Sequence, residues 1–80
     1  MRRYFLHLVD HVDMLLDPHG VNLPADTVER ATLAAARHCM CGDVRNGRLD
    51  LPYRIDVHDE SGTAVHSLPF ADAVEILAPA

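Results

Sequence analysis

Two apolar stretches near the start of the chain predict extended structure. Aromatic and aliphatic side chains fill residues 4–9, a run of strand length. Because a strand alternates its side chains between two faces, one face would carry Tyr4, Leu6 and Leu8, and the other Phe5, His7 and Val9. Both faces are largely apolar, which indicates an inner strand that is covered on both sides or meets a partner on one.

Turn signals divide the apolar residues that follow. Residues 10–13 are polar and predict a turn, and residues 14–16 offer a brief second strand. Asp17-Pro18-His19-Gly20 is a strong turn signal, because proline presets φ and glycine tolerates a positive φ. Residues 21–23 then resume an extended path. We therefore expect two short extended pieces, or one bent strand, in place of a long second strand.

A helical period covers residues 26–45. Asp26 is a favourable N-cap, and Glu29 three residues later completes a capping box. Small and apolar side chains recur in two neighbouring stripes, which are Val28, Ala31, Thr32, Ala35 and Cys39, and Leu33, Ala36, Met40 and Val44. Gly42 is unfavourable inside a helix, so the helix would end there or continue to the stop signal Asn46-Gly47.

The last third of the chain predicts a hairpin. Residues 53–58 alternate cleanly between apolar and polar, and residues 63–68 return as a further strand after a turn at residues 59–62. Helical spacing in the tail, residues 70–77, favours a short helical turn packed on the sheet, although Val74 and Ile76 also alternate like a strand.

The order of elements predicts a single α+β domain over residues 1–80. An antiparallel sheet of about four strands would carry one main helix across one face, in the order β-β-α-β-β, with a short C-terminal element. The other face would be polar, covered by the tail, or buried against a second copy of the chain. The apolar character of both faces of residues 4–9 favours the last two options, and we predict a homodimer.

Charge and composition exclude several function classes. The chain has twelve acidic and seven basic residues, a formal net charge of −5, so it lacks the basic stripe that nucleic acid requires. No apolar run approaches the ~20 residues of a membrane span, and the apolar run after Arg2-Arg3 is too short for an export signal. We expect a cytoplasmic protein with reduced cysteines, and the use of arginine without lysine suggests a bacterial source.

The segment His38-Cys39-Met40-Cys41 contains soft metal ligands. Zinc sites usually space two cysteines further apart, and two residues on a helix turn the side chains ~200° away from each other. Both thiols could face one ion only if the helix ended between them, which Gly42 would allow. We therefore interpret Cys39 as a small core residue of the helix stripe and Cys41 as a residue at its edge.

Asp56, His58 and His66 form a second group of potential metal ligands. With a three-residue loop in the hairpin, Asp56 would lie opposite His66, and all three side chains would share one face of the sheet. A two-residue loop would break this arrangement. We favour a solvated polar face of the hairpin over a metal site.

Evidence for catalysis is weak. Ser61, Ser67 and the cysteines do not form a recognisable nucleophile arrangement, and a thin domain is not expected to hold a pocket of ~300 Å³ or more. We expect no catalytic residue and no cofactor. The favoured function is a non-enzymatic protein-binding or accessory regulatory module that uses the free sheet face or an exposed strand edge. The alternative is a small transition-metal-binding protein with histidine and cysteine ligands.

Two short motifs resemble a known family. The opening Arg3-Tyr4-Phe5-Leu6-His7 and the closing Leu68-Pro69-Phe70-Ala71-Asp72-Ala73, together with Asp17-Pro18-His19-Gly20, resemble a small bacterial family that is known only as a domain of unknown function. The resemblance covers residues 2–77 and implies a compact α+β domain. It implies no activity and no site residues, and His38, Cys39 and Cys41 are not part of its pattern.

Overall fold

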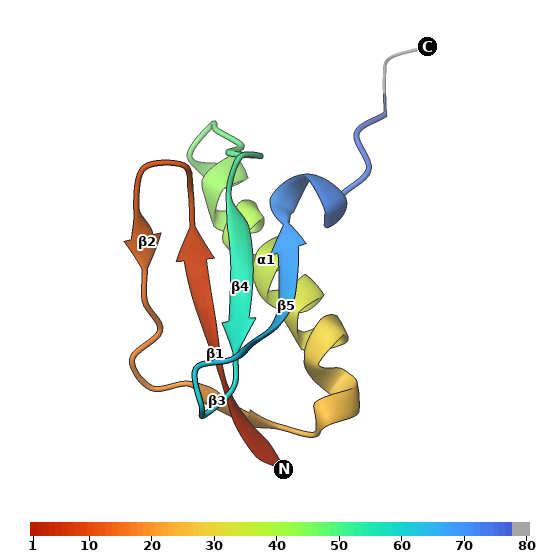
Figure 1. The fold of residues 1–80 in the computed structure, drawn as a ribbon. Coiled ribbons are helices and arrows are strands. Elements are labelled where there is room, and N and C mark those ends of the chain that lie inside the picture. The colour runs from red at the N-terminus through yellow and green to blue at the C-terminus, as the bar shows by residue number, and fades with distance from the viewer. Residues whose placement is uncertain (78–80) are drawn as a thin grey trace.

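The computed structural model describes residues 1–77, so the last three residues of the expected domain lie outside the described part. Within these residues the chain forms five strands, one long helix and two short 3-10 turns (Figure 1). In chain order these are β1 (Arg2–Val9), β2 (Met14–Leu15), β3 (Val21–Leu23), η1 (Ala25–Thr27), α1 (Val28–Arg45), β4 (Arg54–His58), β5 (Ala64–Pro69) and η2 (Phe70–Asp72). The predicted α+β class and order of elements are confirmed.

The sheet is antiparallel, with the order β2-β1-β4-β5 and with β3 also paired to β1. β1 therefore lies inside the sheet, as its apolar run predicts. The second strand is divided into two short pieces, and this expectation is also confirmed: β2 pairs with the end of β1 at Leu8 and Val9, whereas β3 pairs with its beginning, from Arg2 to Tyr4. The division gives five strands where about four were expected.

One face of the sheet carries α1 and the hydrophobic core. The sheet contributes Tyr4, Ile55 and Val57, all at most 4% exposed. Every fourth residue of the helix is buried against them, which gives the series Val28, Thr32, Ala36 and Met40. The sequence assigned this series to two separate stripes. The buried line runs between them because α1 crosses the sheet obliquely and presents a narrow ridge to it (Figure 1).

The C-terminal tail closes the same side of the core. Phe70 begins η2, is 1% exposed, and donates its backbone N–H to the Tyr53 carbonyl at 2.8 Å. The predicted short helical turn is therefore confirmed at residues 70–72. Because the tail packs on the helix side of the sheet, the expectation that it could cover the opposite face is wrong. No helix or strand among residues 1–77 covers that opposite face (Figure 1).

The start of α1 differs from the predicted capping box. Asp26 lies within the 3-10 turn η1, and Thr27 is the N-cap of α1, with no side-chain capping hydrogen bond at either position. Helical structure begins at Ala25, before the expected N-cap Asp26, because the Thr27 N–H already bonds to the Pro24 carbonyl at 3.0 Å and closes a 3-10 turn. The helix continues through Gly42 to Arg45, with Asn46 as its C-cap and Gly47 next at a φ of +81°, so the later of the two predicted ends is correct.

Candidate functional site

The turn at residues 17–20 fills a gap in the sheet. β2 and β3 pair with the two ends of β1 and leave its middle without a strand partner on that edge. The Asp17 carboxylate occupies the gap and accepts the Leu6 backbone N–H at 3.3 Å. Its other oxygen accepts the N–H groups of His19 and Gly20 at 3.2 and 3.1 Å. A side chain thus replaces the missing strand.

These bonds also control the charge of Asp17. Burial by itself would raise the pKa of Asp17, but the hydrogen bonds from Gly20, Leu6 and His19 outweigh it and hold the pKa below its ordinary value of 3.8. In return, the Asp17 N–H donates to Nδ1 of His7 at 3.0 Å. Nδ1 of His7 is therefore the acceptor of this bond, which joins the turn to the middle of β1.

Gly20 is required by both its backbone conformation and its surroundings. Its φ is +70°, a region that side-chain-bearing residues rarely adopt. A Cβ atom at this position would lie 2.8 Å from the Tyr4 carbonyl oxygen and 3.0 Å from Cε1 of Phe5. The turn can therefore lie this close to β1 only with glycine at residue 20.

His7 also belongs to a polar group on the open face of the sheet. It lies opposite Asp56 in the pairing of β1 with β4, and its ring meets that of His58 edge to face, with centroids 4.9 Å apart. Sequence alternation placed His7 on the correct face of β1 but gave no sign that β4 would be the neighbour. A signal for the pairing of β1 with β4 would have been needed to find this group.

The predicted group of Asp56, His58 and His66 is wrong. A β-bulge shifts the register after Val57, so that His58 pairs with Ala64 whereas Val57 pairs with His66. The extra residue turns His66 to the helix side and places Ser67 opposite Asp56.

Asp56 and His7 on this face already have hydrogen-bond partners. The Asp56 carboxylate accepts Nε of Arg54 at 3.0 Å and the Ser67 hydroxyl at 2.7 Å, and Nδ1 of His7 accepts the Asp17 N–H. Within residues 1–77, the structure brings together no three histidine, cysteine or carboxylate side chains in a geometry suited to a metal ion.

The His38-Cys39-Met40-Cys41 segment is dispersed around α1. Met40 is 3% exposed and belongs to the core, whereas His38 and both cysteines are exposed. The expectation of a buried Cys39 is wrong because the buried series follows Met40, and the preceding residue points ~100° away from it. The two thiols line different hollows of the surface, so their predicted divergence is confirmed.

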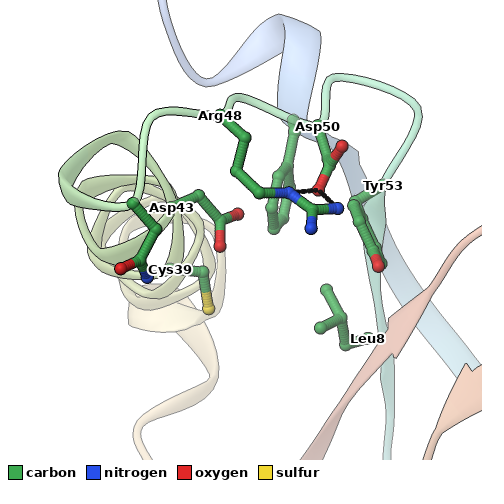
Figure 2. A pocket seen from close by; sticks show the side chains of 8 residues that line it. Leu8, Cys39, Asp43, Arg48, Asp50 and Tyr53 are labelled. Atoms are coloured by element: carbon green, nitrogen blue, oxygen red, sulfur yellow. Dashed lines mark hydrogen bonds and ion pairs between the residues drawn. The ribbon is translucent and has the colours of Figure 1, made fainter.

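Cys39 lines a cavity of about 710 Å³ between α1 and the start of β4, which exceeds the size expected for so thin a domain. Figure 2 shows Cys39 and Asp43 facing Tyr53 and Leu8 across it, with Arg48 extended toward Asp50. The Arg48 guanidinium forms an ion pair with the Asp50 carboxylate at 2.8 Å, so the positive charge that Arg48 brings to the cavity is already balanced.

Two titratable groups of this cavity, Cys39 and Tyr53, have pKa values shifted away from neutral pH. Desolvation of the thiol and the adjacent Asp43 carboxylate raise the pKa of Cys39 above its ordinary value of 9.0. The charge of Asp10 raises the pKa of Tyr53. Both groups therefore stay protonated near pH 7, where Cys39 is a poor nucleophile.

Cys41 lines a second hollow, a groove of about 430 Å³ between the C-terminal half of α1 and the tail. We call it the tail groove. Apolar side chains form most of it, and three charged residues stand in its lining: Arg37, Arg45 and Glu75. Its full apolar lining is Met40, Val44, Leu49, Val74 and Ile76.

A further apolar surface surrounds β2, at the edge of the sheet. Val12, Met14, Leu15 and Leu16 are 81%, 45%, 70% and 61% exposed. We call these four residues the β2 strip. The sequence predicted a strand here but not that its apolar side chains would face solvent, because exposure depends on the absence of a neighbouring element at this edge.

A family model matches residues 3–71, from β1 into η2. The chain belongs to the family described as Domain of unknown function (DUF6894). The family resemblance seen in the sequence is thereby confirmed. The DUF6894 match includes the 17–20 turn, the β2 strip and all of α1. Comparison with curated proteins gives no match, and comparison with solved structures gives none. No helix within residues 1–77 is long and apolar enough to cross a membrane.

Proposed function

We propose that this domain is a non-enzymatic protein-binding module that works as a homodimer in an accessory or regulatory role. The observation that carries the proposal is the β2 strip, where four apolar side chains close together in the chain stand 45–81% exposed. Leu15 lies opposite Leu8 on the helix side of the sheet and Met14 opposite Val9 on the other side, so apolar side chains are exposed on both sides of this edge. Exposed apolar surface is typical of sites that bind other protein chains. Removing apolar surface from water is favourable by roughly 25 cal/mol per Å², and this gain is offset by the entropy that association loses.

The turn at residues 17–20 supports the proposal because it fixes the end of the strip. Leu16 is followed at once by Asp17, whose carboxylate and N–H are bonded to Leu6 and His7 of β1. A surface held in its binding conformation loses little entropy on association. The turn thus gives the exposed residues a defined shape before a partner arrives.

Binding through side chains is favoured over the addition of a strand to a sheet edge. At the β2 edge, the Met14 N–H already donates to the Asp13 carboxylate at 2.8 Å. At the other edge, β5 contains a bulge and ends at Pro69, which has no N–H. Both are known means of protecting a sheet edge from further pairing. The sequence left the free sheet face and an exposed strand edge open as binding surfaces, and we propose side-chain contact at the β2 edge.

The non-enzymatic part of the proposal is supported by the cavity beside Cys39. Acid–base catalysis needs a group whose pKa lies near the working pH. The pKa values of Cys39 and Tyr53 are both shifted upward, away from neutrality. Both cysteines are free, which fits the reducing cytoplasm in which we propose that the domain works.

Sedimentation equilibrium of matched variants tests the proposal. The wild type should associate to a dimer as its concentration rises, and Leu15→Ser with Leu16→Ser should remain monomeric with an unchanged circular dichroism spectrum. Val65→Ser is the control, because Val65 is 46% exposed but lies on the opposite edge strand, β5. A wild type that stays monomeric at high micromolar concentration would refute the homodimer, and equal association of the double variant would remove the β2 strip from the interface.

A further inference from the structure

The cavity beside Cys39 combines an apolar side with an acidic one. Leu8, Tyr53 and Phe70 supply apolar surface, and the ring centroids of Tyr53 and Phe70 lie 5.8 Å apart. Across the cavity from Leu8 and Tyr53, the Asp43 side chain extends from α1 (Figure 2). A ligand with a hydrocarbon part and a charged part could therefore contact both sides at once.

Asp43 is the half-buried aspartate that the fold leaves without a partner. Each of the other half-buried aspartate carboxylates accepts hydrogen bonds from backbone or side-chain donors. These are Asp10, Asp17, Asp50, Asp56 and Asp59. No donor within residues 1–77 bonds to the Asp43 carboxylate, and neither ion pair of this part of the chain includes it. A partly desolvated carboxylate without a hydrogen bond is unfavourable, so a ligand that supplies donors would stabilise it.

The position of Asp43 in the helix adds to this cost. The residue lies in the last turn of α1, where the helix dipole is negative and a carboxylate is unfavourable. Neither its burial nor its place in the helix therefore gives Asp43 a stabilising role. Residues that lower the stability of a fold are concentrated at functional sites.

The groups around the cavity record a negative potential. Desolvation raises the pKa of Cys39, and the charge of Asp43 raises it further. The charge of Asp10 is the largest of the causes that raise the pKa of Tyr53. The lining as a whole carries two carboxylates and one guanidinium, which leaves a formal excess of one negative charge. A negative potential in a partly enclosed space attracts cations.

We infer that this cavity binds a small alkylguanidinium compound, with the cation on the Asp43 carboxylate and the hydrocarbon chain against Leu8 and Tyr53. A guanidinium forms two parallel hydrogen bonds with a carboxylate and stacks on aromatic rings, which suits it to a site where Asp43 faces Tyr53 (Figure 2). The cavity of about 710 Å³ has the size of a small-molecule site. This inference goes beyond the proposed protein-binding function and does not rest on it.

Titration with matched probes, followed by two-dimensional NMR of the full chain, tests the chemistry of the ligand. Butylguanidinium should shift the amide signals of Asp43 and Tyr53 saturably and leave those of the hairpin turn at residues 59–62 unchanged. Butylurea has nearly the same shape without the charge, and methylguanidinium has the charge without the chain. Each should bind at least about tenfold more weakly, because each loses one of the two contacts. Equal binding of butylurea would overturn the inference.

A further probe distinguishes a free compound from a partner chain. A blocked tripeptide with a central arginine carries the same cation on a peptide backbone. It should bind no more tightly than butylguanidinium if the natural ligand is a free compound. Binding at least about tenfold tighter than butylguanidinium would contradict a free ligand, because the backbone would then supply part of the affinity.

Asp43→Asn separates a binding role from a structural one. The variant keeps the shape of the side chain and removes its charge, so butylguanidinium should bind about tenfold more weakly. Because the carboxylate opposes the helix dipole, the variant should be at least as stable as the wild type in urea denaturation. Asp72→Asn is the matched control, since Asp72 is exposed on η2 and does not line the cavity. Its affinity should stay within about twofold of the wild type.

The outcomes separate this inference from the proposed function. The variant Leu15→Ser with Leu16→Ser removes apolar side chains of the β2 strip and should bind butylguanidinium as the wild type does. If the wild type stays monomeric but binds this probe through Asp43, the inference stands and the homodimer is wrong. If Asp43→Asn loses stability while its affinity for butylguanidinium is unchanged, Asp43 is a structural residue and the inference is wrong.

Discussion

Residues 17–20 and residues 38–41 differ in how closely the fold depends on them. The first segment has the sequence of an ordinary turn, yet its carboxylate completes the edge of β1 and its glycine leaves no room for a Cβ atom beside the Tyr4 carbonyl. The second contains the soft ligands that suggest a metal site, yet three of its four side chains are exposed and point in different directions. In this small domain, histidine and cysteine side chains do not mark the residues on which the fold depends. Those residues lie where the backbone requires one particular side chain, as at Asp17 and Gly20.

The largest expected effect comes from Gly20→Ala. The new Cβ would clash with backbone and would also sit at a φ of +70°, so we expect a loss of about 3 kcal/mol of unfolding free energy. Gly62→Ala is the control, because Gly62 has a φ of +81° and open space around it. It should cost about 1 kcal/mol. Urea denaturation measures both, and equal losses would show that the contact with β1 contributes nothing.

Asp17→Ala should have the next largest effect. It removes three hydrogen bonds from backbone N–H groups to a charged acceptor, and we expect a loss of about 2–3 kcal/mol. Asp72→Ala, at an exposed residue of η2, should change stability by less than about 0.5 kcal/mol. The role assigned to the 17–20 turn would be contradicted if the two variants had the same denaturation midpoint.

Acid should remove the contribution of Asp17. Its pKa is lower in the folded state than the ordinary value of 3.8, so its contribution is fully present above that value and is lost as the pH falls through the folded pKa. The stability difference between the wild type and Asp17→Asn should therefore be constant from neutral pH down to about pH 5 and shrink below pH 4. A difference that does not change with pH in this range would disprove the ionised carboxylate.

The smallest effect is expected from the 38–41 segment. The triple variant His38→Ala, Cys39→Ser and Cys41→Ser should stay within about 0.5 kcal/mol of the wild type, because all three side chains are exposed. Zinc should not raise the melting temperature of either protein, since a bound ion would stabilise the folded state by mass action. A zinc-dependent rise in the wild type that the variant lacks would restore the metal-binding alternative.

Periodicity predicted much of the fold. Residue patterns that extend over several positions predict β1, which is apolar on both faces, and the short strands β2 and β3. They also predict the helix and the hairpin. The features that were missed each depend on a single residue. A bulge at Val65 turned His66 to the other face, and the oblique crossing of α1 buried Met40 and exposed Cys39. Such shifts of one residue arise from packing between distant elements, which the local pattern does not contain.

The candidate surfaces were harder to predict than the fold. The sequence identified the apolar residues of the β2 strip but could not tell that no element would cover them. It likewise could not bring Val44 and Leu49 together with the tail to form a groove. Exposure and concavity are properties of the assembled chain, so both surfaces became visible only in the structure.

Hydrogen exchange followed against protein concentration tests the central claim most directly. If the β2 strip is the binding surface of a homodimer, amides in residues 12–16 should exchange more slowly as the concentration rises from low to high micromolar. Amides in the hairpin turn at residues 59–62, which lies away from the strip and the groove, should exchange at a constant rate. Exchange in residues 12–16 that does not respond to concentration would contradict the account.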